Sequence, residues 1–506
     1  MTINVLEFLE RSAGMYPDKC AVNDGENSLT YTQLLEKSMT VGSALADIVK
    51  IGKPVGVYMD KGTDTLVTFF GIVYAGGCYC MLSPELPDNR IHQMQSVIDS
   101  NIVITSANLK EKAEKIFCKE SVLLLEDLEE QPCRYNLLQD IRTDWVDVNP
   151  LYINFTSGST GVPKGIAVSH RSVIDFIFRF TDIFAINNED TIANQAPFDF
   201  DVSVKDIYSA LKVGATLTII PRKYFSVPAR LLDFLCENNV TTMIWAVSAL
   251  CLITTSHGLD YRVPHTVKRI LFSGEIMPQK ALNDWRNHMP DTMLVNLYGP
   301  TEITCNCTYH ILQPNRDYSD GIPIGKPFPN ENVFLLNDNN KLITSSGEVG
   351  RIIVRGTALA LGYYNCPDKT AQSFIQNPLN GSYPETVYDT GDLGSYNELG
   401  ELMYRGRKDN QIKYMGHRIE LEEIEHAMEE IDGVERCICI FDEKRSRLKG
   451  FYVGTIEEDN LHSLLHQTLP IFMIPGILRK LDAIPLTKNG KADRKQMQEI
   501  TERKAK

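Results

Sequence analysis

The chain has 506 residues, more than one ordinary hydrophobic core sustains, so two or three lobes are expected. Apolar residues make up 43% and charged residues 23%, a balance that excludes extended disorder and predicts a globular protein with a large core. The formal net charge of -14 disfavours nonspecific binding to nucleic acids or anionic membranes, because their phosphates repel such a protein.

The N-terminus and the cysteines indicate where the protein works. The first residues carry acids where a secretory signal carries positive charge, and no apolar run reaches the length of about 18 residues that a membrane span needs. Twelve cysteines include three C-x-C pairs: Cys78/Cys80, Cys305/Cys307 and Cys437/Cys439. This spacing suits alternate strand positions better than a zinc site. We therefore expect buried free thiols, no membrane insertion and a cytoplasmic location.

The first elements in chain order alternate between strand and helix. From about Val55 to Leu82, and again from Ile192 to Ile220, short β-branched runs alternate with amphipathic segments, which is typical of α/β layers. Leu217–Pro221 predicts a buried strand closed by proline. Apolar residues at helical spacing after Asp201 predict a helix that begins near that residue.

The C-terminal part has a different pattern of predicted elements. Beyond Gly350, short strands and glycine-rich turns predict a β-rich subdomain. A charged stretch, 404–413, then precedes a helical segment at Glu420–Glu429. We place the main domain boundary near Asp409, which gives a domain of residues 1–408 and a second one of residues 409–506.

A loop dense in hydroxyls and glycines follows the strand-like segment 152–155. It runs from Thr156 to Gly165 and carries Lys164 near its end. Converging backbone N–H groups, hydroxyls and a lysine form a natural phosphate site, although the spacing is not that of a Walker loop. An ordinary flexible loop is the local alternative. The expected phosphate-binding residues are Thr156, Ser157, Gly158, Ser159, Thr160, Gly161 and Lys164.

This loop resembles the signature loop of the adenylate-forming enzymes, the superfamily of acyl-CoA synthetases, luciferases and nonribosomal peptide synthetase adenylation domains. Further strings resemble the ordered motifs of the same family over nearly the whole chain: 29–34, 74–78, 200–203, 296–302, 347–350, 388–392, 406–413 and 489–491. The resemblance implies an α/β fold: a large N-terminal domain of layered sheets and helices with a β-rich subdomain, plus a small mobile α+β C-terminal domain. It also implies ATP and Mg²⁺ as cofactors.

The resemblance assigns roles at the nucleotide. Asp392 is similar to the carboxylate that accepts the ribose hydroxyls, Arg407 to the arginine that contacts ribose or phosphate, and Tyr298 to the residue that stacks on adenine. Glu302 resembles the acid that holds magnesium, which takes only one or two protein carboxylates. Locally, a turn aspartate, a surface arginine and a helix-start acid are the alternatives for Asp392, Arg407 and Glu302. Further nucleotide residues are expected at Asn296, Gly299 and Thr301.

In the family the C-terminal domain rotates between two half-reactions. Lys491 resembles the catalytic lysine that reaches the substrate carboxylate and the α-phosphate, while Asp409 matches the hinge and Gly416 the glycine beside which a pantetheine thiol passes. A solvated lysine and a simple turn glycine are the local alternatives for Lys491 and Gly416.

Asp201 bears on the kind of acid that is activated. In amino-acid-activating members its position holds the substrate ammonium; its local alternative is to cap the helix that begins there. Lys205 suits an acidic or amide side chain, or pairs with Asp201 four residues before it. Matching family positions places the substrate pocket at Asp201, Val202, Lys205, Ser248, Leu271, Ser273, Leu297, Cys305 and Asn306.

The sequence thus predicts an enzyme that activates an amino acid as its adenylate and transfers it to the phosphopantetheine thiol of a separate carrier protein, because no carrier motif follows Lys491. The basic run 444–449 is either the docking patch for that carrier or a solvated connection between strands. A D-alanine:carrier-protein ligase resembles the segments 411–413 and 418–425, but Lys205 and Ser273 depart from its pattern. A small-acid acyl-CoA synthetase and a noncatalytic scaffold are also compatible with the sequence.

Overall fold

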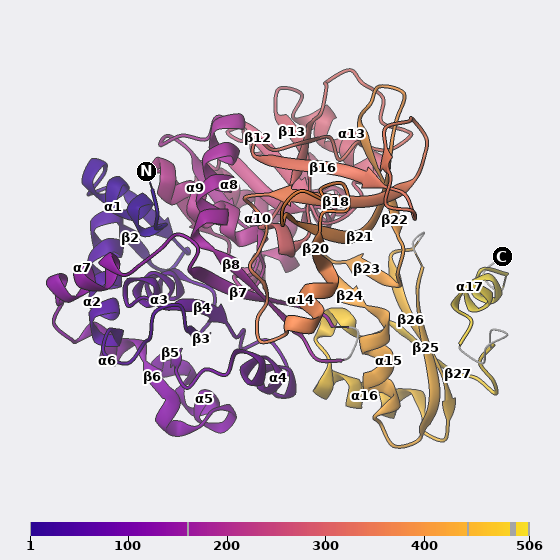
Figure 1. The fold of residues 1–506 in the computed structure, drawn as a ribbon, viewed down its shortest axis with the longest axis horizontal. Coiled ribbons are helices and arrows are strands. Elements are labelled where there is room, and N and C mark those ends of the chain that lie inside the picture. Colours follow the sequence, from indigo (N-terminus) through magenta and orange to yellow (C-terminus); the bar gives the residue numbers. More distant parts are fainter. Residues whose placement is uncertain (1, 159–160, 443–444, 486–491, 504–506) are drawn as a thin grey trace. The chain divides into compact units, whose positions relative to one another are not determined.

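The computed structural model describes residues 2–158, 161–442, 445–485 and 492–503 (Figure 1). The chain divides into two compact units. Unit 1 comprises Met1–Leu82, Ile98–Asn154 and Gly165–Lys408, and unit 2 comprises Ser83–Val97, Phe155–Lys164 and Asp409–Lys506. Asp409 is thus the first residue of the last stretch of unit 2, and two segments from the predicted N-terminal domain group with that stretch.

Unit 1 contains a nine-stranded sheet with a parallel centre. Its strands, in spatial order, are β15 (Lys326–Pro327), β14 (Thr308–Ile311), β13 (Met293–Tyr298), β12 (Arg269–Ser273), β11 (Thr242–Ala246), β9 (Thr191–Asn194), β10 (Thr216–Ile219), β1 (Cys20–Asn23) and β2 (Ser28–Thr30). All neighbours from β13 to β1 pair in parallel. The buried strand predicted at 217–221 is confirmed as β10.

A seven-stranded sheet forms the second layer. It consists, in spatial order, of β19 (Gly362–Tyr363), β8 (Lys164–Ser169), β7 (Pro150–Thr156), β4 (Cys78–Met81), β3 (Pro54–Tyr58), β5 (Val103–Thr105) and β6 (Val122–Leu124). One buried apolar cluster joins both sheets to several helices, among them α1 (Leu6–Met15), α2 (Tyr31–Leu45), α3 (Thr63–Tyr74), α8 (His170–Ile183) and α9 (Val202–Val213). The predicted α/β layering and the helix predicted near Asp201 are therefore confirmed.

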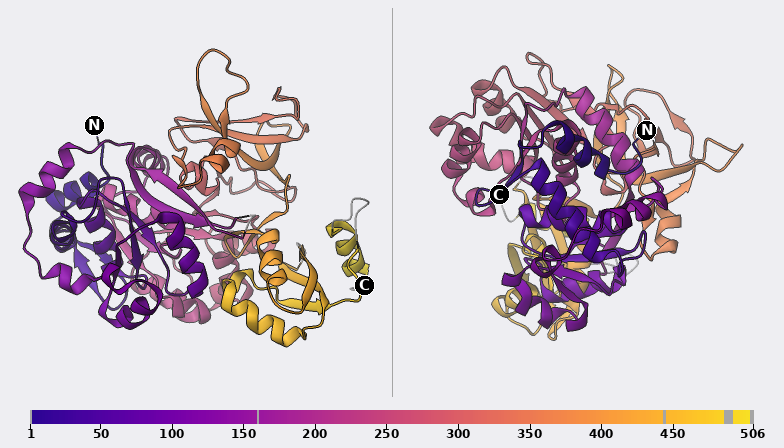
Figure 2. Two further views of the ribbon diagram at one scale, coloured as in Figure 1. Left: turned by 60° about the horizontal axis from the view of Figure 1, so that its bottom comes forward. Right: turned by 90° about the vertical axis from the view of Figure 1, so that its left-hand side faces the viewer.

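The β-rich subdomain predicted beyond Gly350 is a six-stranded antiparallel sheet. Its strands are β17 (Leu342–Ile343), β16 (Glu331–Leu336), β18 (Gly350–Gly356), β21 (Thr386–Tyr396), β20 (Phe374–Gln376) and β22 (Leu402–Arg407), the last paired with β21. In Figure 2 this orange sheet stands apart from the helix-covered sheets of unit 1. The remaining unit 1 helices are α5 (Lys110–Ile116), α6 (Leu125–Glu129), α7 (Tyr135–Thr143), α10 (Pro228–Glu237), α11 (Val247–Thr255), α12 (Gly258–Tyr261), α13 (Gln279–His288) and α14 (Pro367–Ser373).

Unit 2 is a small α+β assembly. Its elements are α4 (Asp88–Ile98), the hairpin of β23 (Gln411–Tyr414) and β24 (His417–Glu420), α15 (Leu421–Glu429), the sheet of β25 (Val434–Asp442), β26 (Arg447–Gly454) and β27 (Ile477–Lys480), and the helices α16 (Glu458–Thr468) and α17 (Arg494–Arg503). The helix predicted at 420–429 is confirmed as α15, which packs on β25 through one apolar cluster.

The expectation of buried free thiols holds for the C-x-C pairs, whereas Cys118 and Cys133 are exposed. All twelve cysteines are free, and the three C-x-C pairs are buried. Two of these pairs lie on strands, whereas Cys305 and Cys307 lie in the connection before β14, so the strand prediction is wrong for them. Within the described ranges, no helix has both the length and the apolar character that crossing a membrane requires.

Candidate functional site

Four parallel strands of the nine-stranded sheet end side by side. β9, β11, β12 and β13 are neighbours in the sheet and terminate at Asn194, Ala246, Ser273 and Tyr298. The carboxyl ends of parallel strands lie at one edge, and the loops and helix starts that follow them gather there, which is where α/β proteins usually bind ligands. The predicted substrate residues are on or next to these strand ends.

Asp201 immediately precedes α9 in this region. Its backbone is helical, with φ -63° and ψ -20°, and its side chain makes no capping hydrogen bond to the helix. The capping role that the sequence left open is therefore not what this carboxylate does. Its carbonyl oxygen accepts a hydrogen bond from Cys305 Sγ at 3.2 Å, which ties the start of α9 to the turn at 304–306.

The turn at 304–306 has an unusual backbone. Thr304 and Cys305 have φ of 50° and 75°, a region that side chains other than glycine rarely adopt. A hydrogen bond from Thr304 Oγ1 to Ala358 O at 2.7 Å stabilises it. Gly299 permits the close packing, since a Cβ there would lie 2.4 Å from Asn306 Cα. Burial raises the pKa of the Cys305 thiol well above its usual range, so Cys305 is a packing residue and not a nucleophile.

Lys205 is buried in the same region, with 1% of its surface exposed. Its Nζ donates to Asn306 Oδ1 at 2.7 Å and to Ser273 Oγ at 3.5 Å. Burial lowers the pKa of Lys205, an effect that the nearby Asp201 opposes, but Asp201 is not within ion-pair distance. Of the two roles that the sequence left open for Lys205, direct pairing with Asp201 is thus not observed.

The remaining predicted pocket residues line the same strand ends. Leu271 on β12 and Leu297 on β13 are buried, while Val202 and Ser248 are partly exposed in the first turns of α9 and α11. The structure therefore brings the predicted substrate residues to one edge of the sheet, and it joins Lys205, Ser273 and Asn306 directly.

A buried polar cluster beside Lys205 was missed by the sequence reasoning. Lys61 Nζ donates to the carbonyl oxygens of Asn194 at 3.2 Å and Gln195 at 3.1 Å, and Asn194 Nδ2 donates to Asp206 Oδ2 at 2.7 Å. Burial lowers the pKa of Lys61 to about 7 and raises that of Asp206 to about 8. The one available signal was the adjacent charged pair Lys205 and Asp206 in α9; for Lys61 there was none.

Three of the predicted nucleotide residues contact one another. Asp392 is 1% exposed, accepts a hydrogen bond from the Tyr298 hydroxyl at 2.6 Å, and forms an ion pair with Arg407, its neighbour across β21 and β22. Burial raises the pKa of Tyr298 well above its usual range, so its hydroxyl keeps the proton that it donates to Asp392. This buried carboxylate is held in place by two donors from different strands.

Glu302 is the predicted magnesium ligand. It lies with Thr301 in a short helix, Thr301–Ile303, is 1% exposed, and accepts a hydrogen bond from the Tyr363 hydroxyl at 2.8 Å. Nearby, Asn296 Nδ2 donates to Pro323 O at 2.9 Å. Across the part of the chain that the structure describes, no three potential metal ligands cluster together. One carboxylate fits Mg²⁺, which completes its shell from phosphate and water, better than it fits zinc.

The phosphate loop belongs to unit 2, where side chains from β24 and α15 meet it. Ser157 Oγ donates to Arg418 O at 2.7 Å and accepts from Glu420 N at 3.1 Å. The Gly158 N–H donates to Glu423 Oε2 at 3.0 Å, and Lys164 Nζ lies 3.6 Å from Glu420 Oε1. The donors expected to hold phosphate therefore contact carboxylates and backbone of the same unit.

Glycine is required at position 158, because a Cβ there would lie 2.0 Å from Val162 O. Gly161 has a φ of 78°, which also favours glycine, and Thr156 is the last residue of β7. The predicted residues Ser159 and Thr160 lie outside the described residues.

The unit 2 predictions beyond the loop have mixed outcomes. Met415 and Gly416, with φ of 52° and 82°, form the two-residue turn between β23 and β24, and Asp409 Oδ1 accepts from Gln411 N at 3.2 Å. Lys491 lies outside the described residues. In the predicted basic docking patch, Lys449 is 8% exposed and bound to Asp442 at 2.7 Å, so this lysine cannot contact a partner.

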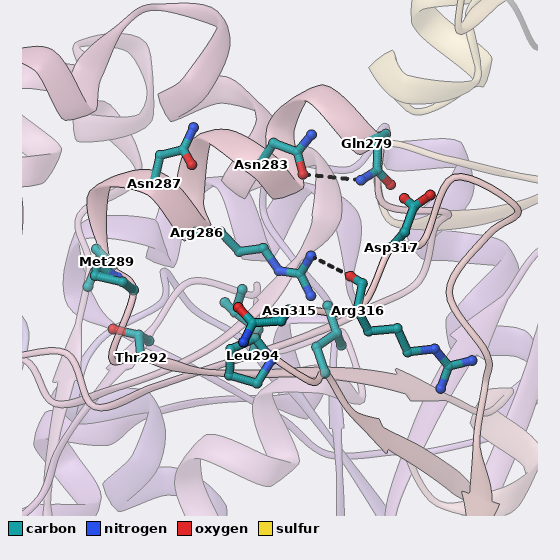
Figure 3. Close-up of a pocket in the computed structure, with 13 residues that line it drawn as sticks. Gln279, Asn283, Arg286, Asn287, Met289, Thr292, Leu294, Asn315, Arg316 and Asp317 are labelled. Atoms are coloured by element: carbon teal, nitrogen blue, oxygen red, sulfur yellow. Dashed lines mark hydrogen bonds between the residues drawn. The ribbon is translucent and has the colours of Figure 1, made fainter.

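A depression of about 510 Å³ lies elsewhere on unit 1, between α13 and the loop 314–317 (Figure 3). Its cations are committed to the fold: Arg286 donates to the carbonyl oxygens of Gln313 and Arg316, and Arg316 forms an ion pair with Glu401 at 2.5 Å. None of the predicted site residues lines it. The depression is therefore a surface feature without the chemistry of the strand-end region.

Comparison with known proteins gives one family. The family model described as AMP-binding enzyme matches residues 9–364. Zwittermicin A synthase ZmaJ of Bacillus cereus is 31% identical over 98% of this chain and 94% of that protein. Bacitracin synthase 1 of Bacillus licheniformis is 32% identical over 97% of this chain, but the chain spans only 9% of that protein's length.

Solved structures share the fold. A structure of the Vibrio cholerae adenylation domain AlmE, in complex with glycyl-adenosine-5'-phosphate, matches with a TM-score of 0.84 at 20% identity, and the match covers 99% of this chain and 98% of that chain. At 20% identity this match shows a shared fold and carries no assignment of substrate.

Proposed function

The chain belongs to the AMP-binding enzyme family, and from this premise we propose that it activates an amino acid with ATP and passes the aminoacyl group to the thiol of a carrier protein. The observation that carries the amino-acid assignment is Asp201. This carboxylate immediately precedes α9 at the strand ends, beside the other predicted pocket residues, and we assign it as the partner of a substrate ammonium.

The proposed first step forms the adenylate. A carboxylate oxygen of the amino acid attacks the α-phosphorus of ATP, the bond to the β-phosphate oxygen breaks, and pyrophosphate leaves. Ser157, Gly158 and Lys164 hold the phosphates, and Lys491 stabilises the charge that develops during the in-line displacement. Glu302 would hold Mg²⁺, which would supply positive charge against the triphosphate.

The nucleoside part is held by the unit 1 residues. The carboxylate of Asp392 accepts the ribose hydroxyls, and Arg407 and Tyr298 fix its position. In the second step the thiolate sulfur of a carrier attacks the acyl carbon, the carbon–oxygen bond to AMP breaks, and AMP leaves. A solved structure of the same fold is described as an NRPS protein containing adenylation and PCP domains, which supports a carrier as the acceptor.

A pyrophosphate-exchange assay over D- and L-amino acids tests the proposal. Matched acids without the ammonium, propionate beside alanine and glutarate beside glutamate, are the controls. We expect exchange with at least one amino acid and none with its matched control. Exchange only with the acids that lack an ammonium would replace the proposal with a small-acid acyl-CoA synthetase. Retained ATP binding with no exchange for any acid would leave a noncatalytic scaffold.

A further inference from the structure

Lys205 is a buried cation whose hydrogen-bond partners are neutral. It is 1% exposed, and its Nζ donates to the amide oxygen of Asn306 and the hydroxyl of Ser273. Among the described residues, no carboxylate lies within ion-pair distance of Nζ. Burying an ammonium among dipoles alone is costly, and an opposite charge at close range offsets that cost.

The nearest acids do not supply that charge. Asp206, the next residue on α9, is fully buried, burial raises its pKa to about 8, and it forms no ion pair with Lys205. Its Oδ2 accepts from Asn194, and its Oδ1 has no hydrogen-bond partner. Asp201 also acts on Lys205 electrostatically without forming an ion pair with it. Both acids favour the charged form of Lys205, and neither pairs with it directly.

Substrate binding removes the electrostatic support that Asp201 gives to the charged form of Lys205. In the proposed function, on which this inference rests, the substrate ammonium pairs with Asp201 and neutralises it. Lys205 is then a buried charge with less compensation, unless the substrate itself brings a second carboxylate. Asp201 and Lys205 are four residues apart at the start of α9, which places them on one helix face with their Cβ atoms about 6 Å apart.

We infer that the substrate is an amino acid whose side chain ends in a carboxylate, and that Lys205, with Ser273 and Asn306, binds this carboxylate. The Asn306 amide oxygen and the Ser273 hydroxyl orient the ammonium group of Lys205, because both accept hydrogen bonds from it. A carboxamide would offer Lys205 an oxygen but no charge, and the charge is what the site lacks. A competing interpretation is that Lys205 only fills the pocket, in which case small neutral amino acids are preferred.

Pyrophosphate exchange with the intact chain separates these interpretations. Aspartate is compared with asparagine, and glutamate with glutamine, in both chiral forms, with glycine, alanine and leucine as neutral references. We expect kcat/KM for one acid to exceed that for its amide by on the order of 10²-fold, because the amide leaves the buried charge unpaired. A preference for an amide or for any neutral amino acid would overturn the inference and leave the proposed function intact. Exchange with no amino acid would overturn both.

Two variants give the decisive readout. In Lys205→Met, kcat/KM for the acid should fall on the order of 10²- to 10³-fold, while that for its amide should change less than about tenfold. Lys212→Met is the matched control: Lys212 lies on the same helix and pairs with the exposed Asp182, and its loss should leave both values unchanged. Thermal unfolding monitors the fold of both variants. If Lys205→Met remains folded and kcat/KM falls equally for the acid and its amide, Lys205 does not recognise the side-chain carboxylate.

Discussion

Asp201→Asn tests the most specific claim about the substrate. The replacement preserves the size of the side chain and removes only its charge. The Asp201 side chain makes no capping hydrogen bond, so the substitution removes no helix cap and should not cost the roughly 1 kcal/mol of unfolding free energy that losing a cap costs. The bond between Cys305 Sγ and the carbonyl oxygen of Asp201 involves the backbone and remains.

The effect on activity should be much larger than the effect on stability. Breaking a buried ammonium–carboxylate pair costs about 3 to 5 kcal/mol, and Asp201 is only partly buried, which favours the lower figure. About 3 kcal/mol corresponds to a decrease on the order of 10²-fold in kcat/KM for the amino acid. Exchange should be measured below saturation, where the rate reports kcat/KM.

Asp199→Asn is the matched control, since Asp199 lies on the same turn. Burial raises the pKa of Asp199 to about 6, so it is still mostly ionised at neutral pH, and Asp199→Asn removes a comparable charge at a position that is not assigned to the substrate ammonium. Its kcat/KM should decrease less than tenfold. The reasoning is refuted if Asp201→Asn lowers the unfolding temperature by several degrees and leaves kcat/KM unchanged, because Asp201 would then be a structural residue.

Three further predictions concern the nucleotide, the lysine and pH. Tyr298→Phe removes a hydrogen bond to the buried Asp392 and should lower the free energy of unfolding in urea by about 1.5 to 3 kcal/mol, whereas Tyr309→Phe, whose hydroxyl has no hydrogen bond in the described structure, should not. Lys491→Ala should lower the exchange rate on the order of 10²- to 10³-fold with ATP affinity retained by calorimetry, and an unchanged rate would refute its role. Because burial lowers the pKa of Lys205, kcat/KM for an acidic substrate should fall as pH rises through that lowered value; the fall should disappear in Lys205→Met.

The ordered motifs predicted residues that the structure brings together, because each motif carries a local backbone requirement. Gly158 and Gly299 occupy positions where a Cβ would collide with the backbone of a residue close by in sequence, so the motif and the geometry are inseparable. Tyr298, Asp392 and Arg407 come from three such motifs, and the antiparallel register of β21 and β22 brings the last two together. Local strings with strict spacing therefore located these residues without a structure.

The contacts of Lys205 could not be predicted in the same way, because its partners are distant in the sequence. The spacing of four residues suggested a pair with Asp201, yet its hydrogen bonds go to Ser273 and Asn306, 68 and 101 residues away. Such partners are set by how β12 and the turn after β13 meet α9, which no local pattern encodes. Lys61, bound to carbonyls 133 and 134 residues away, lies in a segment with no distinguishing feature. When buried polar residues hydrogen-bond to partners far away in the sequence, the sequence near either residue gives no pattern that predicts the bond.

The phosphate loop has both a local motif that the sequence reveals and long-range contacts that it does not. Its sequence identifies the donors, but it does not reveal that Ser157 and Gly158 already bond to the segment 418–423 within unit 2. The Gly158 N–H has a single hydrogen, so it cannot serve both Glu423 and a phosphate at full strength. Glu423 in turn forms an ion pair with Arg90, which would retain the carboxylate when the loop releases it. With the phosphate role proposed for this loop, nucleotide affinity would include the free energy of separating the loop from α15, which the loop motif alone does not determine.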